Sequence, residues 1–177
     1  MYQLLIGVLT SPALQGYFSV GRGADLLKLL TGVSTLLVLV ASGKYLKEHY
    51  QHTLEYPTMV ALALWFMLFL VQANHLISAF LCIVGFSLNL YVLILYDIAV
   101  RPSREAGLKY YYLSTLSSGL VLYGAFLLYA LSGSGEFGEL YTFFLRDGIR
   151  YSELARAAVM LTIFGVFFKL SAVPAHL

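Results

Sequence analysis

Lys169 is the residue whose surroundings point most directly to chemistry. It lies in the otherwise uncharged stretch LTIFGVFFKLSAVP, and Pro174 and His176 follow within seven residues. A charge at membrane depth costs roughly 2.5 to 3.5 kcal/mol, so such a lysine needs a partner or a function. Pro174 has no amide hydrogen and breaks or kinks a helix. The carbonyl groups freed by a break admit water at membrane depth, which suits proton or ion transport.

Two interpretations of Lys169 follow from the residues alone. The lysine stands about seventeen residues into its predicted helix, and near a helix end a long side chain reaches the membrane surface. In the second interpretation the side chain faces the interior of a helix bundle. Burial there disfavours the ammonium form, so the lysine takes up and releases a proton during transport.

Glu105 and Lys109 form the second candidate group. They lie four residues apart in RPSREAGLKYYYLS, in the order that favours an ion pair on a helix. Ser103 or Pro102 is expected to help cap that helix. The pair either sets the depth of the helix at the membrane surface or admits protons or ions to a polar path.

Other chemistry is not indicated. The single cysteine, Cys82, excludes an internal disulfide and a cysteine-based metal site. We find no histidine and cysteine cluster, no nucleophile motif and no phosphate-binding loop. The sequence therefore predicts no catalytic residue, metal or cofactor in this chain, and no nucleic-acid partner. His75 lies between two predicted helices and is expected to form hydrogen bonds at the membrane interface.

The composition indicates what must position these residues. Of 177 residues, 60% are hydrophobic and 11% are charged, and the mean hydropathy is +0.81. A soluble domain carries about 25% charged residues. The sequence therefore predicts an all-α integral membrane protein in contact with the lipid bilayer.

Five stretches are apolar enough to be predicted as membrane-spanning helices, the last of them discontinuous. Residues 1–23 are expected to form an interfacial or re-entrant segment, and GELYTFFLRDG an amphipathic helix in the interface. Lysines and arginines divide evenly between the two sides, so their bias assigns no orientation. Four small residues in the fourth span are expected to make close helix contacts: Ser117, Ser118, Gly119 and Gly124. The five predicted spans are Asp25–Tyr45, Pro57–Gln72, His75–Tyr96, Glu105–Leu131 and Ser152–Pro174.

Three stretches carry a resemblance to a known family. ANHLISAFLCIVGFSL, REAGLKYYYLSTLSSGLVLYGAFLLYALSG and FGVFFKLSAVPAHL occur in this order. Together they resemble the subunit 2 family of respiratory complex I, the proton-pumping NADH:ubiquinone oxidoreductase. This family comprises antiporter-like membrane subunits related to cation/proton antiporters. The likeness covers about residues 24–177, which correspond to helices three to seven of the family.

The resemblance implies a role for each candidate residue. Lys169 falls on the lysine of a discontinuous helix, His176 on the histidine after the break, and Glu105 and Lys109 on the pair opening the sixth helix. In the family these positions form a proton relay. It also implies that the loops at 44–56 and 97–104 lie on the matrix or cytoplasmic side. Other membrane-arm subunits of complex I become the expected partners, and the mitochondrial inner membrane the expected location.

Two departures from the family pattern affect this interpretation. Val84 stands where the family has a glutamate that partners the lysine, so its usual carboxylate is missing. The family also continues beyond the histidine, so we expect a split subunit whose second half is a separate polypeptide. The leading hypothesis is a complex I subunit that contributes to proton translocation without covalent catalysis of its own. The alternatives are a non-pumping scaffold of the membrane arm and a free-standing cation/proton antiporter fragment.

Overall fold

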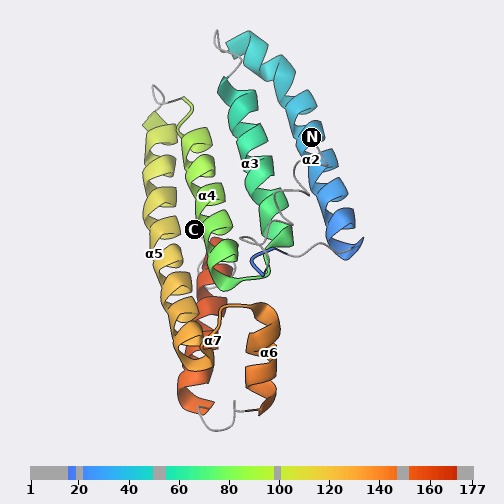
Figure 1. Cartoon of the computed structure of the whole chain (residues 1–177). Helices are drawn as coiled ribbons and strands as arrows, with labels where there is room; N and C mark the ends of the chain where they lie inside the picture. The colour runs from blue at the N-terminus through green and yellow to red at the C-terminus, as the bar shows by residue number, and fades with distance from the viewer. Residues whose placement is uncertain (1–15, 19–21, 50–54, 98–100, 147–151, 171–177) are drawn as a thin grey trace. The chain divides into compact units, whose positions relative to one another are not determined.

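The structure, a computed structural model, describes residues 16–18, 22–49, 55–97, 101–146 and 152–170. These residues form helices and no β-strand, apart from two isolated bridges. The predicted all-α fold class is therefore confirmed. The helices are α2 (Arg22–His49), α3 (Glu55–Gln72), α4 (Leu76–Ile94), α5 (Arg101–Ser132), α6 (Phe137–Arg146) and α7 (Ser152–Lys169) (Figure 1).

Four of the described helices are long and apolar enough to cross a membrane. They correspond to the first four predicted spans, with ends shifted by a few residues. α7 is not among the four, because Glu153, Arg156 and Lys169 place three charges in its 18 residues. The predicted continuation of this helix to Pro174 lies outside the described residues, as does most of the predicted segment 1–23.

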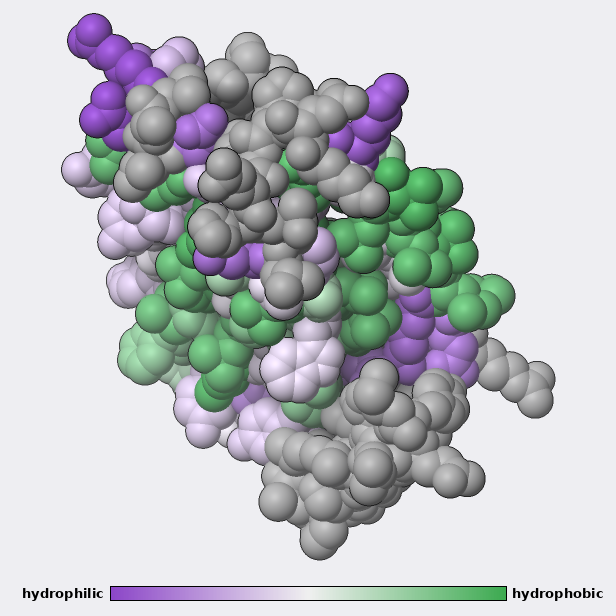
Figure 2. All heavy atoms as spheres, turned by 90° about the horizontal axis from the view of Figure 1, so that it is seen from above, coloured by the Kyte–Doolittle hydropathy of each residue, from purple (hydrophilic) through white to green (hydrophobic). Residues whose placement is uncertain are grey.

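Large apolar side chains lie on the surface as well as in the interior. Figure 2 shows hydrophobic side chains over much of the face in view. Leu36, Val40 and Phe126 are each more than 60% exposed. Exposing such large apolar side chains is unfavourable in water but not in lipid. Together with the four candidate spans, this pattern identifies a multi-pass membrane protein.

The chain divides into two compact units, and the boundary falls within α4 and within α5. One unit holds α2, α3, residues 82–94 of α4 and the first turns of α5. In it α2 packs against α3, and a Cβ atom on Gly85 of α4 would overlap the ring of Phe66 on α3. In this unit α4 therefore approaches α3 at a small residue, Gly85.

The other unit holds residues 16–18, the start of α4, most of α5, and the helices α6 and α7. Its core is formed by Leu128 of α5, Leu140 of α6 and Ala158 of α7, which are all buried. Leu140 is the buried residue of α6, whose other residues are largely exposed. The amphipathic helix predicted here is thus present, and its apolar side covers α5 and α7.

A polar junction joins three connecting segments of this second unit. The backbone amide of Asn74 donates to the backbone carbonyl oxygen of Tyr17 at 2.8 Å. The backbone amide of Phe137 donates to the backbone carbonyl oxygen of Asn74 at 3.1 Å. His75 caps α4, because its Nδ1 accepts a 3.1 Å hydrogen bond from the Ile77 amide. The His75 ring is buried and lies 4.7 Å from the ring of Tyr17. The expected hydrogen-bonding role of His75 is confirmed.

Candidate functional site

Lys169 is the last residue of α7, and its side chain is partly buried. The Leu170 amide still donates to the carbonyl oxygen of Val166 at 3.1 Å. In an α-helix each amide pairs with the carbonyl group four residues earlier, so Gly165 is the regular partner of the Lys169 amide. Pro174 and His176 lie outside the described residues, and the helix break and the role of His176 remain predictions.

The turn before Lys169 is tied to α5 by a buried hydrogen bond. Ser117 has no exposed surface, and its hydroxyl group donates to the Gly165 carbonyl oxygen at 2.7 Å. A Cβ atom on Gly165 would lie 2.9 Å from the backbone nitrogen of Val121 and 3.1 Å from the carbonyl oxygen of Ser117. The two backbones therefore approach so closely that only glycine fits at this position of α7.

A second close contact lies further along the same pair of helices. A Cβ atom on Gly124 of α5 would lie 2.7 Å from the backbone nitrogen of Thr162 and 3.0 Å from the carbonyl oxygen of Ala158. Each helix thus contributes one glycine that faces the backbone of the other helix. α5 and α7 accordingly lie side by side (Figure 1). The two glycine contacts define the register of one helix along the other.

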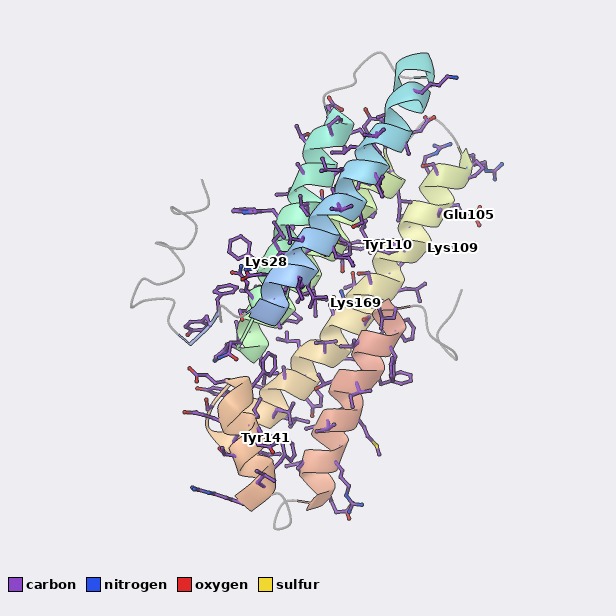
Figure 3. The ribbon with its side chains drawn as sticks, turned by 90° about the vertical axis from the view of Figure 1, so that its right-hand side faces the viewer. Lys28, Glu105, Lys109, Tyr110, Tyr141 and Lys169 are labelled. Carbon is purple, nitrogen blue, oxygen red and sulfur yellow. The ribbon has the colours of Figure 1, made fainter. Side chains whose placement is uncertain are left out.

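The spacing of residues on α7 defines the side on which Lys169 lies. Ala155, Ala158, Thr162 and Gly165 follow one another at intervals of three and four residues, and all but Thr162 are buried. Lys169 is the next member of this series, so it belongs to the side of α7 that faces α5. Figure 3 shows Lys169 at the end of α7, beside α5. This position favours the bundle-facing interpretation of the lysine.

The prediction of close helix contacts in α5 is right for two of its four residues. Ser117 and Gly124 face α7. Within the described part of the chain, a Cβ atom on Gly119 would meet nothing within 4 Å. The hydroxyl group of Ser118 donates to Ser114 of its own helix at 2.8 Å. Sequence alone did not separate these residues, because small side chains occur on both faces of α5.

Glu105 and Lys109 form the predicted ion pair at the start of α5, with 2.8 Å between Glu105 Oε1 and Lys109 Nζ. Both side chains are about two-thirds exposed, at 65% and 67%, and they belong to the other unit. Of the two residues expected to help cap α5, Ser103 lies inside the helix, and its hydroxyl group donates to the Ile94 carbonyl oxygen of α4 at 2.6 Å. Pro102 lies in the first turn of α5, as expected for a proline.

α4 contains no acidic residue, and Val84 is a partly buried apolar residue of this helix. Asn89, five residues later, is only 4% exposed. Its Nδ2 donates to the Met59 carbonyl oxygen of α3 at 2.6 Å, and its Oδ1 has no hydrogen-bond partner among the described residues. Sequence reasoning did not single out Asn89. The signal was available, since an amide inside the apolar run SLNLYVL is unusual in a membrane helix.

A second lysine of a predicted span is also shielded. Lys28 of α2 is 16% exposed and lies 3.0 Å from the carboxylate of Asp25. The pairing of Lys28 with Asp25 was not predicted from the sequence. The two residues are three positions apart, a spacing that brings side chains together on a helix. α7 has no acidic residue within one turn of Lys169, so a carboxylate for that lysine has to come from another element.

Comparison with known proteins gives consistent results. The sequence profile of the family described as "NADH:quinone oxidoreductase/Mrp antiporter, TM" matches residues 73–177, more than half of the chain. NADH-quinone oxidoreductase subunit N of Parvibaculum lavamentivorans is 34% identical over 162 residues, covering 92% of this chain and 33% of the relative. Subunit N of Rhodospirillum rubrum is 37% identical over 150 residues, covering 85% of this chain and 31% of the relative.

Among solved structures, a chain of respiratory complex I from Thermus thermophilus with bound aureothin superposes with a TM-score of 0.65. It is 27% identical, and the match covers 90% of this chain and 34% of that chain. The chain thus spans about a third of the length of the relatives it matches. Because the matched profile covers more than half of the chain, the protein belongs to the NADH:quinone oxidoreductase/Mrp antiporter transmembrane family.

Proposed function

We propose that this chain forms part of the membrane arm of respiratory complex I and that Lys169 takes part in proton translocation there. The relatives are subunits of NADH-quinone oxidoreductase, and the similar solved structure is a respiratory complex I. The observation that carries the proposal is the position of Lys169 on the α5-facing side of α7, one turn beyond a buried cross-helix hydrogen bond. This position supports the bundle-facing interpretation of Lys169 over a lipid-facing anchor.

The chemistry proposed for Lys169 is reversible protonation. Burial disfavours the ammonium form and a nearby carboxylate favours it, so a change in either alters the affinity of the amine for a proton. Glu105 and Lys109 are proposed to admit protons at the start of α5, and His176 to accept them beyond the predicted break. The chain itself performs no covalent step and holds no cofactor in this proposal.

Exchanging Lys169 for an uncharged residue of similar length tests the proposal. In vesicles with the assembled complex, Lys169→Met should lower the number of protons translocated per quinone reduced. Lys44→Met is the matched control, because Lys44 is an exposed residue at the end of a candidate span. An unchanged ratio in Lys169→Met, at normal complex content, would rule out the pumping role.

One observation favours a second candidate function, a non-pumping scaffold of the membrane arm. The resemblance implies that Val84 stands where the family has a glutamate, and α4 contains no acidic residue. In the family that glutamate would favour the protonated form of the lysine, so valine at this position supports a module that does not pump. The scaffold predicts that Lys169→Met assembles and pumps like the unmodified protein, so the same measurement separates the two functions.

The partners and the compartment of this chain are proposals that go beyond its membership of the family. The part of the relatives that this chain does not match, on this or a second polypeptide, is proposed to complete the proton path. We also propose the subunit 2 position and the mitochondrial inner membrane, although the relatives named above are bacterial. Purification at a fixed ratio with other complex I subunits from isolated mitochondria would support these assignments. Recovery of the chain alone would favour a free-standing antiporter fragment.

A further inference from the structure

We propose that Ser117 is a positioning residue for Lys169. The inference rests on the proposed role of Lys169 in proton translocation. Ser117 donates to the carbonyl oxygen of Gly165 at 2.7 Å, and Gly165 stands four residues before Lys169 on the same side of α7. Ser117 thus acts on the lysine through the backbone turn that carries it.

The hydrogen bond of Ser117 differs from those of its neighbours on α5. The hydroxyl groups of Thr115 and Ser118 donate to carbonyl groups of α5 itself, at 2.8 Å in each case. Such bonds are intrahelical and hold no second helix. The hydroxyl group of Ser117 instead crosses to α7, and the side chain has no exposed surface. Away from water, this bond has no solvent competitor.

The acceptor is the carbonyl group that pairs with the Lys169 amide in a regular helix. Ser117 therefore supplies a second donor to the Gly165 oxygen, independent of the helical bond. The last turn of α7 is wound, since the Leu170 amide donates to the Val166 carbonyl oxygen. The bond from Ser117 to Gly165 therefore anchors the start of the turn that carries Lys169.

The close glycine contacts determine which part of α7 depends on the hydrogen bond from Ser117. Gly124 and Gly165 place the backbones of α5 and α7 against each other at two points, which limits sliding and rotation of α7. The hydrogen bond from Ser117 lies at the contact nearer to Lys169. Its loss leaves the contact near Gly124 in place and frees mainly the end of α7 that bears the lysine.

Three variants of the assembled complex test the inference. Ser117→Ala removes the cross-helix donor, Ser117→Thr keeps a hydroxyl group, and Ser118→Ala removes a neighbouring hydroxyl group that bonds only within α5. We expect Ser117→Ala to lower the protons translocated per quinone reduced by about twofold or more, because small misplacements of a reacting group reduce rates strongly. Ser117→Thr should restore most of the ratio, and Ser118→Ala should match the unmodified protein.

Amide hydrogen exchange of the peptide containing Val166 to Leu170 gives a second measurement. We expect faster exchange in Ser117→Ala than in Ser118→Ala, since the end of α7 loses its tie to α5. Equal exchange and equal pumping in the two alanine variants would overturn the inference. If Lys169→Met pumps normally, the proposed function fails; if Lys169→Met is impaired but Ser117→Ala is not, only the positioning role fails.

Discussion

Ser117 and Gly165 are joined by a 2.7 Å hydrogen bond that links α5 to α7 one turn before Lys169. The donor is fully buried, and a Cβ atom on the acceptor residue would collide with the backbone of α5. The chain thus brings a polar bond and a backbone contact together at one point. Lys169, the only lysine of α7, lies one turn beyond that point. The packing of α7 on α5 therefore positions the residue proposed to carry protons.

Gly165→Ala should destabilise the protein. The added methyl group would lie 2.9 Å from the Val121 nitrogen, and overpacking of this kind costs about 1 to 3 kcal/mol. Thermal unfolding of the purified protein in lipid nanodiscs measures the change. Gly119→Ala is the matched control, because an added Cβ atom there meets nothing within 4 Å and alanine favours a helix over glycine by about 1 kcal/mol. Equal midpoints for the two variants would contradict the close contact.

Glu105→Gln should leave the unfolding midpoint unchanged and lower proton translocation. Its carboxylate is 65% exposed in the pair with Lys109, so it contributes little to stability. In the proposed function the same carboxylate admits protons at the start of α5. The control is Glu153→Gln, since Glu153 is also exposed and paired, with Arg156. If both variants pump normally, the pair serves only to set the depth of α5.

The helices of this fold could be predicted from the sequence because long apolar runs leave few alternatives in a membrane. The start of α3 was predicted within two residues, since Pro57 constrains where that helix begins. α5 begins at Arg101, four residues before the predicted start at Glu105. The exception is the last span. α7 carries three charges in 18 residues, and the predicted continuation to Pro174 lies outside the described residues.

The environment of the candidate residues was harder to predict, because it depends on which helices meet. Lys169 was identified from its charge and from the proline after it, but its orientation required the register of α7 on α5. Ser117 and Ser118 are identical in type and adjacent in sequence, and only the structure shows that one crosses to α7 and the other does not. The acceptor of the Asn89 amide likewise depends on the pairing of α3 with α4.

Asn89→Leu and Asn89→Asp should differ sharply in stability. Leucine removes the donor to Met59 and also the buried Oδ1 that has no partner among the described residues, so we expect a change within about 1 kcal/mol. Aspartate places a carboxylate oxygen against the Met59 carbonyl oxygen and should destabilise by roughly 2 to 4 kcal/mol. Thermal unfolding in nanodiscs tests this order. Similar midpoints for both variants would show that the assigned amide contact does not form.

His75→Ala should weaken the polar junction at the start of α4. It removes the 3.1 Å hydrogen bond that caps the helix at Ile77 and the ring contact with Tyr17 at 4.7 Å. Loss of a cap costs about 1 kcal/mol, and an aromatic pair contributes about 0.5 to 1.5 kcal/mol. We therefore expect a lower unfolding midpoint and faster amide exchange in residues 16–18 and 73–77.

His75→Asn separates these two contributions, because asparagine restores a capping acceptor but not the ring. Its midpoint should lie between those of the unmodified protein and His75→Ala. Gly135→Ala offers an independent check, since an added Cβ atom would lie 3.0 Å from His75 Nδ1 and closer to other ring atoms. It should increase exchange in the same segments while every histidine contact atom is retained. Unchanged exchange in both His75→Ala and Gly135→Ala would mean that His75 does not hold these segments together.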